Sequence, residues 1–432
     1  MPSIRLATLK SVPVFLVSGL LCFALKLSAE GKILGLLTAT TFAIGLGARP
    51  STKGLQYTAW IVVAFLTGML FPQHFQQFND YKWTGLLIVQ LVMFGMGTQM
   101  RLNDFVGVLK MPRSVGIGLI CQFSIMPIVG FVLAKSFGFP PEIAAGVVLI
   151  GACSSGLASN VMAFLAKANL ALSITLTSVA TLLAPLVTPL WMNLLAGQMI
   201  EVEFLSMMAT VVKIVLLPIG AALLHDFMKK AKPNQRRLVH GIAIVAGFWL
   251  IILVAGGWPW ISLRLTGDTL LLAVVLPGYL LSTFLVGTLY HHSTKVFPSL
   301  EKSMPFVSMF GICYFTLVAT AAGQASLVQV GLLLLVAAVL HNTAGYILGY
   351  GLSRLFRLSE QDARTIALEV GLQNGGMASG IALSMGKLGT VGLASAVFSP
   401  WMNVSGSLLA NYWRHLTLRR KQSSVLKQST DP

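Results

Sequence analysis

The chain has 432 residues, of which 56% are hydrophobic and only 10% are charged. A soluble domain of this length carries more charge, so the composition excludes an ordinary soluble protein and indicates a polytopic membrane protein. The net charge of +17 does not indicate a nucleic-acid partner, because the basic residues lie in short connections between apolar runs.

Apolar runs of about 18 or more residues, long enough to cross a bilayer as helices, recur along the whole chain. Because a spanning segment must satisfy its own backbone hydrogen bonds, we expect an all-α polytopic membrane protein. The predicted segments are 12–27, 32–48, 56–73, 84–99, 115–135, 142–167, 171–196, 204–227, 239–257, 269–290, 304–323, 326–351, 363–386 and 388–412. The first resembles a signal peptide, and a retained first helix explains it equally well.

The connections between these segments alternate in charge. Most basic residues lie in the even-numbered connections and at both ends of the chain: Arg5, Lys10, Arg49, Lys53, Arg101, Lys110, Arg113, Lys167, Lys229, Lys230, Lys232, Arg236, Arg237, Lys295, Lys302, Arg354, Arg357, Arg364, Arg414, Arg419, Arg420 and Lys421. The odd-numbered connections hold few, such as Lys82, Lys135 and Arg264. The positive-inside rule therefore predicts a multi-pass protein of the cell (inner) membrane with both termini in the cytoplasm.

Two stretches of the chain resemble each other. "GLASNVMAFLAK" at 156–167 and "GMASGIALSMGK" at 376–387 share Gly-x-Ala-Ser and a lysine eleven residues after the first glycine. The segment count places Lys167 on the cytoplasmic side and Lys387 on the outside, so the two copies have opposite orientation. Inverted repeats with broken helices are typical of secondary transporters with a site near the bilayer midplane.

The sharpest functional signal is "EVGLQNGGMASG" at 369–380, where Glu369 lies in an apolar neighbourhood and glycines then weaken the helix. A charge near the bilayer centre costs about 2.5–3.5 kcal/mol. The carboxylate, the carboxamides of Gln373 and Asn374 and unwound carbonyls are ligands that hard cations prefer. Glu369 is therefore a candidate cation ligand or proton carrier, and a carboxylate at a helix end near the interface is the structural alternative.

A second polar stretch, "GACSSGLASNVM" at 151–162, interrupts another segment. Ser159 and Asn160 stand at the start of a half-helix and are candidate site residues. Ser154 and Ser155 are equally well explained by close helix packing.

Four more polar residues lie inside apolar segments. Ser173 and Thr177 are four residues apart and share one helical face. Gln122 stands alone, which by itself favours an interhelical hydrogen bond. Lys213 either faces a cavity and meets an anion or pairs within the protein.

No resident cofactor is indicated. The four cysteines lie in apolar segments and form no CxxC pair, so neither a disulfide framework nor a zinc site is predicted. The seven histidines show no metal-binding spacing, and we expect His291 and His292 to form a solvated pair in a loop.

The stretches "GACSSGLASNVMAFLAKANLALSITLTSVATLLAPLVTPLW", "CQFSIMP", "EVGLQNGG" and "NVSGSLLANYW" together resemble the bile acid:sodium symporter (BASS) family, over roughly residues 56–412. The resemblance implies ten helices as two inverted five-helix repeats, with two crossing broken helices in a core domain that moves against a panel domain. Here the broken pair would be 142–167 and 363–386.

The resemblance also implies two sodium sites that share Glu369. The first would consist of Ser159, Asn160, Ser173, Thr177 and Glu369, and the second of Gln122, Glu369, Gln373 and the carbonyls of Val370 and Leu372. The glycines would leave two half-helix N-termini aimed at an anionic substrate. The residues expected to bind it are Gly156, Leu157, Asn374, Gly375 and Asn403.

The chain departs from the family pattern in three ways. Two helices precede the family region within residues 1–55, and another pair is inserted at 239–290. Near the expected substrate cavity, Cys153-Ser154-Ser155-Gly156-Leu157 replaces a frequent Cys-Pro-Gly-Gly-Thr, and Trp401-Met402-Asn403 replaces Trp-His-Asn. The expected parts are panel helices near 56–99, 204–227 and 304–323, core helices near 115–196 and 326–412, and a basic cytoplasmic tail at 413–432.

These observations together predict a sodium-coupled symporter that imports a small or amphipathic organic anion. The alternative is a proton-coupled or efflux carrier on the same fold, with Glu369 as the proton site. A membrane enzyme such as a lipid-linked transferase would need an acidic or histidine cluster at a membrane face, and the connecting loops hold none. The expected partners are sodium ions, the organic anion and the lipid bilayer.

Overall fold

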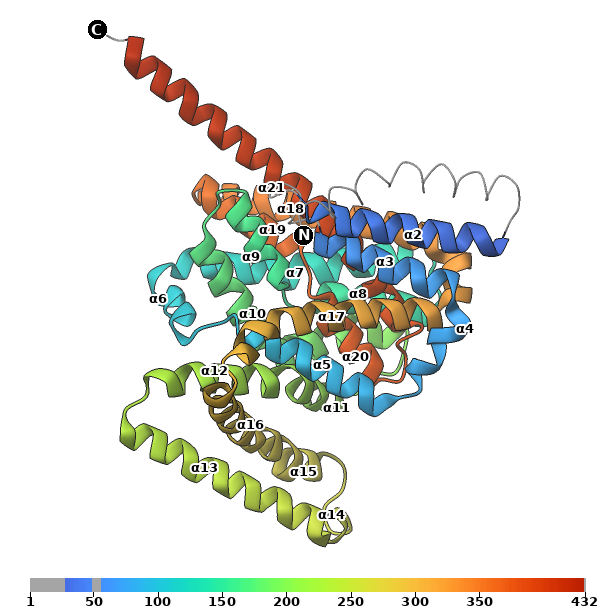
Figure 1. Cartoon of the computed structure of the whole chain (residues 1–432), viewed down its shortest axis with the longest axis vertical. Helices are drawn as coiled ribbons and strands as arrows, with labels where there is room; N and C mark the ends of the chain where they lie inside the picture. Colours follow the sequence, from blue (N-terminus) through green and yellow to red (C-terminus); the bar gives the residue numbers. More distant parts are fainter. Residues whose placement is uncertain (1–27, 49–55, 431–432) are drawn as a thin grey trace.

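The computed structural model describes residues 28–48 and 56–430, and nearly all of them are helical (Figure 1). The predicted segment 12–27 and the basic residues Arg49 and Lys53 lie outside the described residues. Each later predicted segment coincides with one helix or with a helix in pieces. Within the described ranges there is no strand, only one isolated bridge, so the prediction of an all-α polytopic membrane protein is confirmed.

The chain order of the helices follows the predicted segments closely. The main helices are α2 (Ser28–Leu46), α3 (Gln56–Leu70), α5 (Lys82–Gly97), α7 (Pro112–Ser136), α8 (Pro141–Ala152), α9 (Leu157–Leu165), α10 (Leu170–Leu195), α11 (Phe204–Val211), α12 (Leu217–Lys230), α13 (Pro233–Ile252), α16 (Leu276–Val296), α17 (Ser299–Ala322), α18 (Gln324–Leu355), α19 (Glu360–Gly371), α20 (Gly375–Ser384) and α21 (Val391–Thr430). Short helices occupy two connections, α4 (Pro72–Phe75) and α6 (Gly107–Lys110). Two further short helices, α14 (Trp258–Ser262) and α15 (Gly267–Leu270), continue α13 and α16 through π-helical turns. By length and composition, seven of the described helices can cross a membrane unbroken, or up to nine if bent pairs count as one.

Two of the predicted segments are broken in mid-course. The backbone leaves the helix after α8 at Cys153 (φ −74°, ψ 161°) and is still extended at Gly156 (φ −98°, ψ 163°), where α9 begins. It leaves the helix after α19 at Leu372 (φ −108°, ψ 92°), and α20 begins at the next glycine, Gly375. These breaks free backbone N–H and C=O groups inside the protein, where they need partners.

The two breaks cross each other and supply those partners. Ser155 and Gln373 form an antiparallel bridge, in which the Gly156 amide donates to the Leu372 carbonyl (3.1 Å) and the Asn374 amide donates to the Ser154 carbonyl (2.9 Å). The crossing also corrects the register of the internal repeat. Gly156 precedes α9 and Asn374 precedes α20, so the structural equivalent of Gly156 is Asn374, two residues before the glycine that the sequence match selects.

Close packing brings α5 against α20. A side chain at Gly380 would meet Val89 at 2.2 Å, and one at Gly85 would meet Leu383 at 2.5 Å. Glycine therefore lets these two helices approach more closely than any larger residue would allow, as at many helix contacts in membranes.

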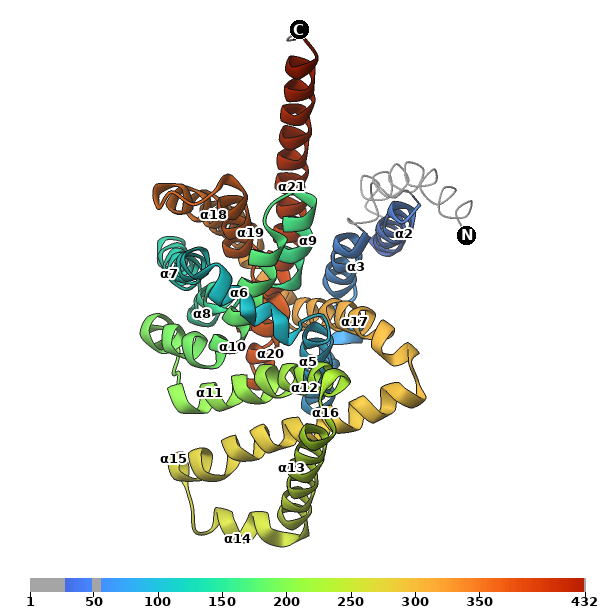
Figure 2. The same cartoon turned by 90° about the vertical axis from the view of Figure 1, so that its left-hand side faces the viewer.

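α13 and α16 form a hairpin arm that projects from the rest of the molecule (Figures 1 and 2). They pack on each other, and α16 packs on α12. Only 17% and 11% of the most apolar stretches of the two arm spans are buried, against 50–61% for the spans of α7, α10 and α11–α12. Because these stretches are mostly apolar, lipid suits their exposed faces.

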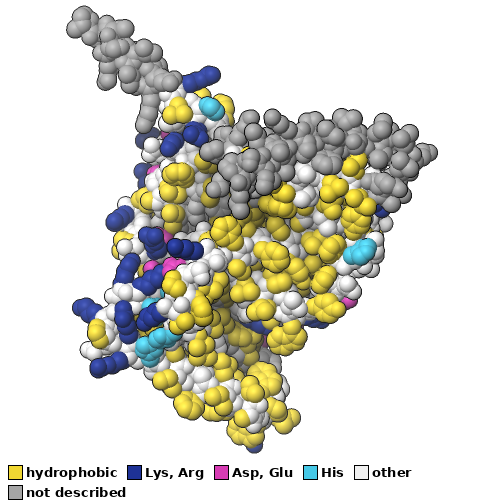
Figure 3. All heavy atoms as spheres, in the orientation of Figure 1, with side chains coloured by type: hydrophobic (Ala, Val, Ile, Leu, Met, Phe, Trp, Pro, Cys, Tyr) yellow, Lys and Arg dark blue, Asp and Glu magenta, His cyan; other side chains and the backbone are white. Residues whose placement is uncertain are grey.

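Basic side chains gather at one edge of the molecule. In Figure 3 the Lys and Arg side chains lie along the left edge, where Figure 1 places α6 and the α12–α13 connection. The opposite edge, near α4, shows few of them, and apolar side chains cover most of the face between. This separation matches the alternation of charge along the sequence.

Candidate functional site

Glu369 lies at the crossing and is only 2% exposed. Three hydroxyl groups donate to its carboxylate. Ser155 (2.5 Å) and Thr177 (2.8 Å) donate to Oε2, and Ser173 donates to Oε1. No basic side chain of the described residues pairs with Glu369. A buried carboxylate that lacks a counter-charge is costly, and hydroxyl donors offset only part of that cost.

The other members expected for the first sodium site surround the same carboxylate. Asn160 Oδ1 lies 2.8 Å from the Ser173 hydroxyl and 3.3 Å from the Thr177 hydroxyl, so it is an alternative acceptor for the protons that these hydroxyls donate to Glu369. The Ser159 hydroxyl donates to the Gly156 carbonyl (2.7 Å) and lies 3.3 Å from the Thr177 hydroxyl. The fold thus brings five predicted residues from three helices to one point, and all of them offer oxygen atoms.

The residues expected for the second sodium site lie at the same crossing. Gln122 Nε2 donates to Gln373 Oε1 (2.9 Å) and to the Cys153 carbonyl (3.1 Å). Gln373 Nε2 in turn donates to the Val370 carbonyl (2.6 Å). Gln122 Oε1 is buried and has no hydrogen-bond partner. Such an orphaned acceptor is rare in proteins and suits a cation that approaches from its side.

Both carbonyls of the second set already accept a hydrogen bond, that of Val370 from Gln373 Nε2. The Leu372 carbonyl accepts from the Gly156 amide across the crossing. Its second lone pair stays free to bind a cation. The neighbouring Gly371 carbonyl accepts from Asn342 Nδ2 (2.5 Å), whose Oδ1 accepts from Ser405. Side chains of α18 and α21 therefore hold the unwound segment in place.

Sequence reasoning missed Ser155 as a site residue. Packing explained it equally well in the sequence, but in the structure its hydroxyl bonds directly to Glu369. In sequence, Ser155 lies four residues before Ser159, a spacing that places two side chains on one face of a helix. Here the helix is broken between the two residues, so the spacing does not predict that they meet. Ser154 instead donates to Met377 Sδ (3.8 Å) and accepts from Thr181 (3.2 Å).

A cavity of about 280 Å³ opens beside the crossing. Its lining includes all five residues expected to bind the substrate: Gly156, Leu157, Asn374, Gly375 and Asn403. The N-termini of α9 and α20 both border it, since Gly156 and Asn374 are their N-cap residues. Among the described residues that line it, none is charged; the remaining polar groups include Tyr57, Gln99 and Ser308.

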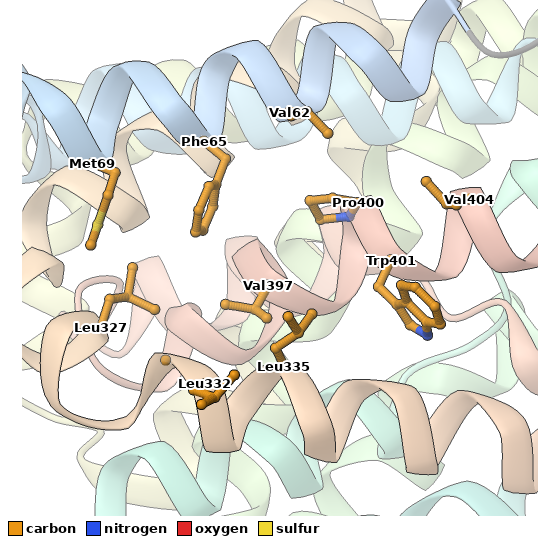
Figure 4. A pocket seen from close by; sticks show the side chains of 11 residues that line it. Val62, Phe65, Met69, Leu327, Leu332, Leu335, Val397, Pro400, Trp401 and Val404 are labelled. Carbon is orange, nitrogen blue, oxygen red and sulfur yellow. The ribbon is translucent and has the colours of Figure 1, made fainter. Parts of the chain in front are cut away.

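A larger cavity of about 380 Å³ lies on another face of α21 (Figure 4). Phe65 and Met69 of α3 face Val397 and Trp401 of α21 across it. Its lining is apolar apart from the indole of Trp401. It offers hydrocarbon contacts but few groups that can orient an anion, so the smaller cavity is the better candidate for a substrate site.

The fold bears on two other expectations. Lys213 lies in a π-helical turn between α11 and α12 (Val212–Leu216) and does not line the cavity at Asn374. The expectation of a solvated loop pair for His291 and His292 is wrong. Both lie within α16, His291 is only 5% exposed, and its Nδ1 lies 3.2 Å from His225 Nδ1. Periodicity did not predict this because the helix extends six residues beyond the predicted apolar segment.

Crossed broken helices, a buried carboxylate among hydroxyl groups and an adjoining cavity define a membrane transporter. Residues 86–258 match the family model described as the sodium bile acid symporter family. The chain is 32% identical over 373 residues to the uncharacterized sodium-dependent transporter YocS of Bacillus subtilis, a match that covers 86% of this chain and 94% of that protein. The chain therefore belongs to the sodium bile acid symporter family, and it is a transporter, not an enzyme.

A further relative is also described as a cotransporter. The probable sodium/metabolite cotransporter BASS1 of Arabidopsis thaliana chloroplasts is 27% identical, over 83% of this chain and 73% of that protein. A solved structure, the sodium proton antiporter MjNhaP1 of Methanocaldococcus jannaschii, matches 96% of this chain and 97% of its own with 16% identity and a TM-score of 0.47, and no conclusion rests on it. Membership in a family of sodium-dependent transporters implies sodium as the coupling ion.

Proposed function

We propose that this chain is a symporter that imports a small organic anion together with two sodium ions by alternating access. It works in the cell (inner) membrane, with both termini in the cytoplasm. The observation that carries the proposal is the unpaired carboxylate of Glu369, buried among oxygen donors at the helix crossing. Sodium, a hard cation, replaces its water shell with such oxygens and supplies the missing positive charge.

Two ions share Glu369 in this proposal. Ser159, Asn160, Ser173 and Thr177 bind the first ion. Gln122, Gln373 and the carbonyls of Val370 and Leu372 bind the second. The orphaned Gln122 Oε1 supports the second site, because a bound cation would satisfy it. One carboxylate cannot neutralise two cations, so the pair of ions leaves net positive charge beside the cavity.

The substrate is an organic anion that binds in the cavity of about 280 Å³ beside the crossing. The N-termini of α9 and α20 each present partial positive charge and free amide groups to it. Asn374 and Asn403 add polar side chains, and Gly156, Leu157 and Gly375 let backbone approach the ligand. Because no basic side chain among the described residues lines the cavity, a singly charged anion fits it better than a doubly charged one.

The position of this cavity supports the proposal of alternating access. It is bordered by the start of α3, the end of α5 and the start of α17, the ends that the charge pattern assigns to the cytoplasm. Toward the other side, the contact of Gly380 with Val89 and of Gly85 with Leu383 closes the space between α5 and α20. This arrangement corresponds to an inward-facing state.

Movement of a core against a panel would expose the site to the other side. The core comprises α7–α10 and α18–α21, and the panel comprises α3, α5, α11–α12 and α17, within residues 56–412. Residues 1–55 and the arm at 239–290 lie outside this machinery, and 413–432 form a tail. With a monovalent anion, one net positive charge enters per cycle. A tenfold sodium gradient gives about 1.4 kcal/mol per ion, and 100 mV adds about 2.3 kcal/mol.

The test is uptake of candidate monocarboxylates into proteoliposomes, with sodium titrated and the potential set by potassium diffusion. We expect a sodium Hill coefficient near two and uptake that increases with an inside-negative potential. Gln122→Ala and Thr177→Ala should each lower the coefficient toward one. Uptake driven by a pH gradient without sodium would instead establish the proton-coupled alternative, with Glu369 as the proton site.

A further inference from the structure

Two rows of polar side chains face each other where α10 packs against α19. Asn169, Ser173 and Thr177 are spaced four residues apart at the start of α10, and Asp362, Thr365 and Glu369 are spaced three and four apart on α19. Each row therefore occupies one helical face. We call these six residues the polar seam.

Hydrogen bonds join the two rows at every turn. Near the crossing, Ser173 and Thr177 donate to Glu369. Closer to the helix ends, the Asn169 amide donates to Thr365 Oγ1 (2.9 Å), and Asn169 Nδ2 donates to Asp362 Oδ1 (2.8 Å). Polar oxygens thus continue from Glu369 to the first turn of α19, the end of the helix that the charge pattern places in the cytoplasm.

The seam is walled by apolar residues on both helices. Leu172 and Leu176 of α10 and Ile366 and Val370 of α19 are all buried in one apolar cluster. Capping explains only part of the seam, because the Asn169 carboxamide oxygen caps α10 by accepting from the Leu172 amide (3.1 Å). The hydroxyl of Thr365 is fully buried, and it joins the N-cap residue of α10 to α19 by accepting from the Asn169 amide and lying 3.1 Å from the Asn169 carbonyl.

The end of the seam at the first turn of α19 carries a carboxylate without a counter-charge. Asp362 is partly exposed and accepts from Asn169 Nδ2 and from the Ser114 hydroxyl (3.0 Å). It forms no ion pair with any of the residues that the structure describes. Arg364, two residues later, pairs with Glu360 instead. A partly exposed carboxylate without a counter-charge attracts cations by its own field.

We infer that the polar seam is the route by which the sodium ion of the first site leaves for the cytoplasm, with Asp362 at its mouth. The inference rests on the proposed function and on the proposed orientation. A cation that moves along α19 meets an oxygen at each turn, about every 5.4 Å, in surroundings that otherwise lack polar groups. Release past Gly156 into the substrate cavity is the competing route.

A route and a binding site leave different kinetic signatures. A residue on the route changes the height of the barrier, so the rates of binding and release fall together and the dissociation constant stays the same. A ligand of the bound ion changes the dissociation constant. A residue with only a structural role changes the melting temperature and neither rate.

The experiment measures binding and release of radiolabelled sodium by the purified full-length chain in detergent. In Thr365→Val, which keeps the size of the side chain, both rates should fall about tenfold with the dissociation constant within about twofold. The matched control is Thr175→Val, a buried threonine of α10 whose hydroxyl bonds to Asp104 and Ala171 carbonyls outside the seam. It should leave both rates unchanged.

Asp362→Asn tests the mouth of the route separately and serves if Thr365→Val fails to fold. Both rates should fall severalfold at low ionic strength, and less at high ionic strength, because salt screens an exposed charge. Unchanged rates in the folded variants, or a changed dissociation constant with an unchanged rate of binding, would overturn the route. If the unmodified chain binds no sodium, the proposed function fails together with the route. The variants by themselves test only the route.

Discussion

The helix crossing and the hairpin arm differ in almost every physical respect. At the crossing, Glu369, Gln122 and the hydroxyls around them are buried. Two helices lose intrahelical hydrogen bonds where they are broken, and they bond to each other there. In the arm, α13 exposes large apolar side chains such as Phe248 and Ile251, and α16 exposes Leu289. In a bilayer, lipid can cover an apolar surface, so apolar side chains need no protein partner. Buried polar groups therefore distinguish a functional site from a structural or lipid-facing part of the protein.

The largest expected effect comes from Glu369→Gln, which removes the charge that balances both ions. We expect sodium-driven uptake to fall at least about 100-fold and the sodium-dependent rise in melting temperature to disappear, since both sites lose their shared ligand. Uptake into proteoliposomes and a thermal-shift titration with sodium measure the two effects.

Glu301→Gln is the matched control at the base of the arm. The side chain of Glu301 is 43% exposed and pairs with Lys229 and His225, so loss of its charge should change uptake less than about twofold. If Glu369→Gln transports as well as Glu301→Gln, the crossing is not the coupling site.

Asn374→Ala should separate the substrate from the ions. Its Oδ1 caps α20 by accepting from the Met377 amide (3.0 Å), so stability should fall by about 1 kcal/mol. We expect substrate affinity to fall about tenfold or more while sodium still stabilises the protein. Isothermal titration calorimetry with a transported anion measures the substrate affinity, and a thermal-shift titration with sodium measures the stabilisation.

Asn193→Ala is the control for Asn374→Ala. Asn193 lies at the far end of α10, and its side chain donates to the Val202 carbonyl. It should keep substrate affinity. Equal loss of sodium stabilisation in Asn374→Ala would instead assign Asn374 to an ion site.

A smaller effect is expected where the crossing meets α5. Gly380→Ala places a side-chain carbon 2.2 Å from Val89, so α20 and α5 must separate. We expect uptake to fall severalfold because the closed contact no longer forms, and the double variant Gly380→Ala with Val89→Ala to recover most of it. Uptake rates of the two variants decide this, and no recovery in the double variant would argue against this contact as the outer closure.

The smallest effect on transport is expected in the arm. His291→Ala removes the hydrogen-bond partner of His225 Nδ1, so stability should fall by about 1–2 kcal/mol. Sodium affinity should stay within about twofold, since neither histidine touches the crossing. The control is the exposed His74→Ala, which should change neither quantity, and a selective loss of sodium affinity in His291→Ala would make the arm part of the coupling machinery.

The sequence by itself determined the membrane class, the helical segments from 32–48 onward and the family. Apolar length, the alternation of charge and the motifs around Glu369 are local properties, and a bilayer allows few folds other than helices. The same stretches indicated Ser159, Asn160, Ser173, Thr177, Gln122 and Gln373 as candidates, and the fold brings them together, while their binding of sodium stays a prediction.

Only the tertiary structure decided which polar groups meet. Ser155 and Ser154 are neighbours in sequence, yet only Ser155 reaches Glu369, because the chain is extended between α8 and α9 and its side chains point in opposite directions there. The register of the repeat, the burial of His291 and the pairing of Asn169 with Asp362 also depend on contacts between distant segments. Sequence periodicity describes one helix at a time, and a site at a crossing is made by two.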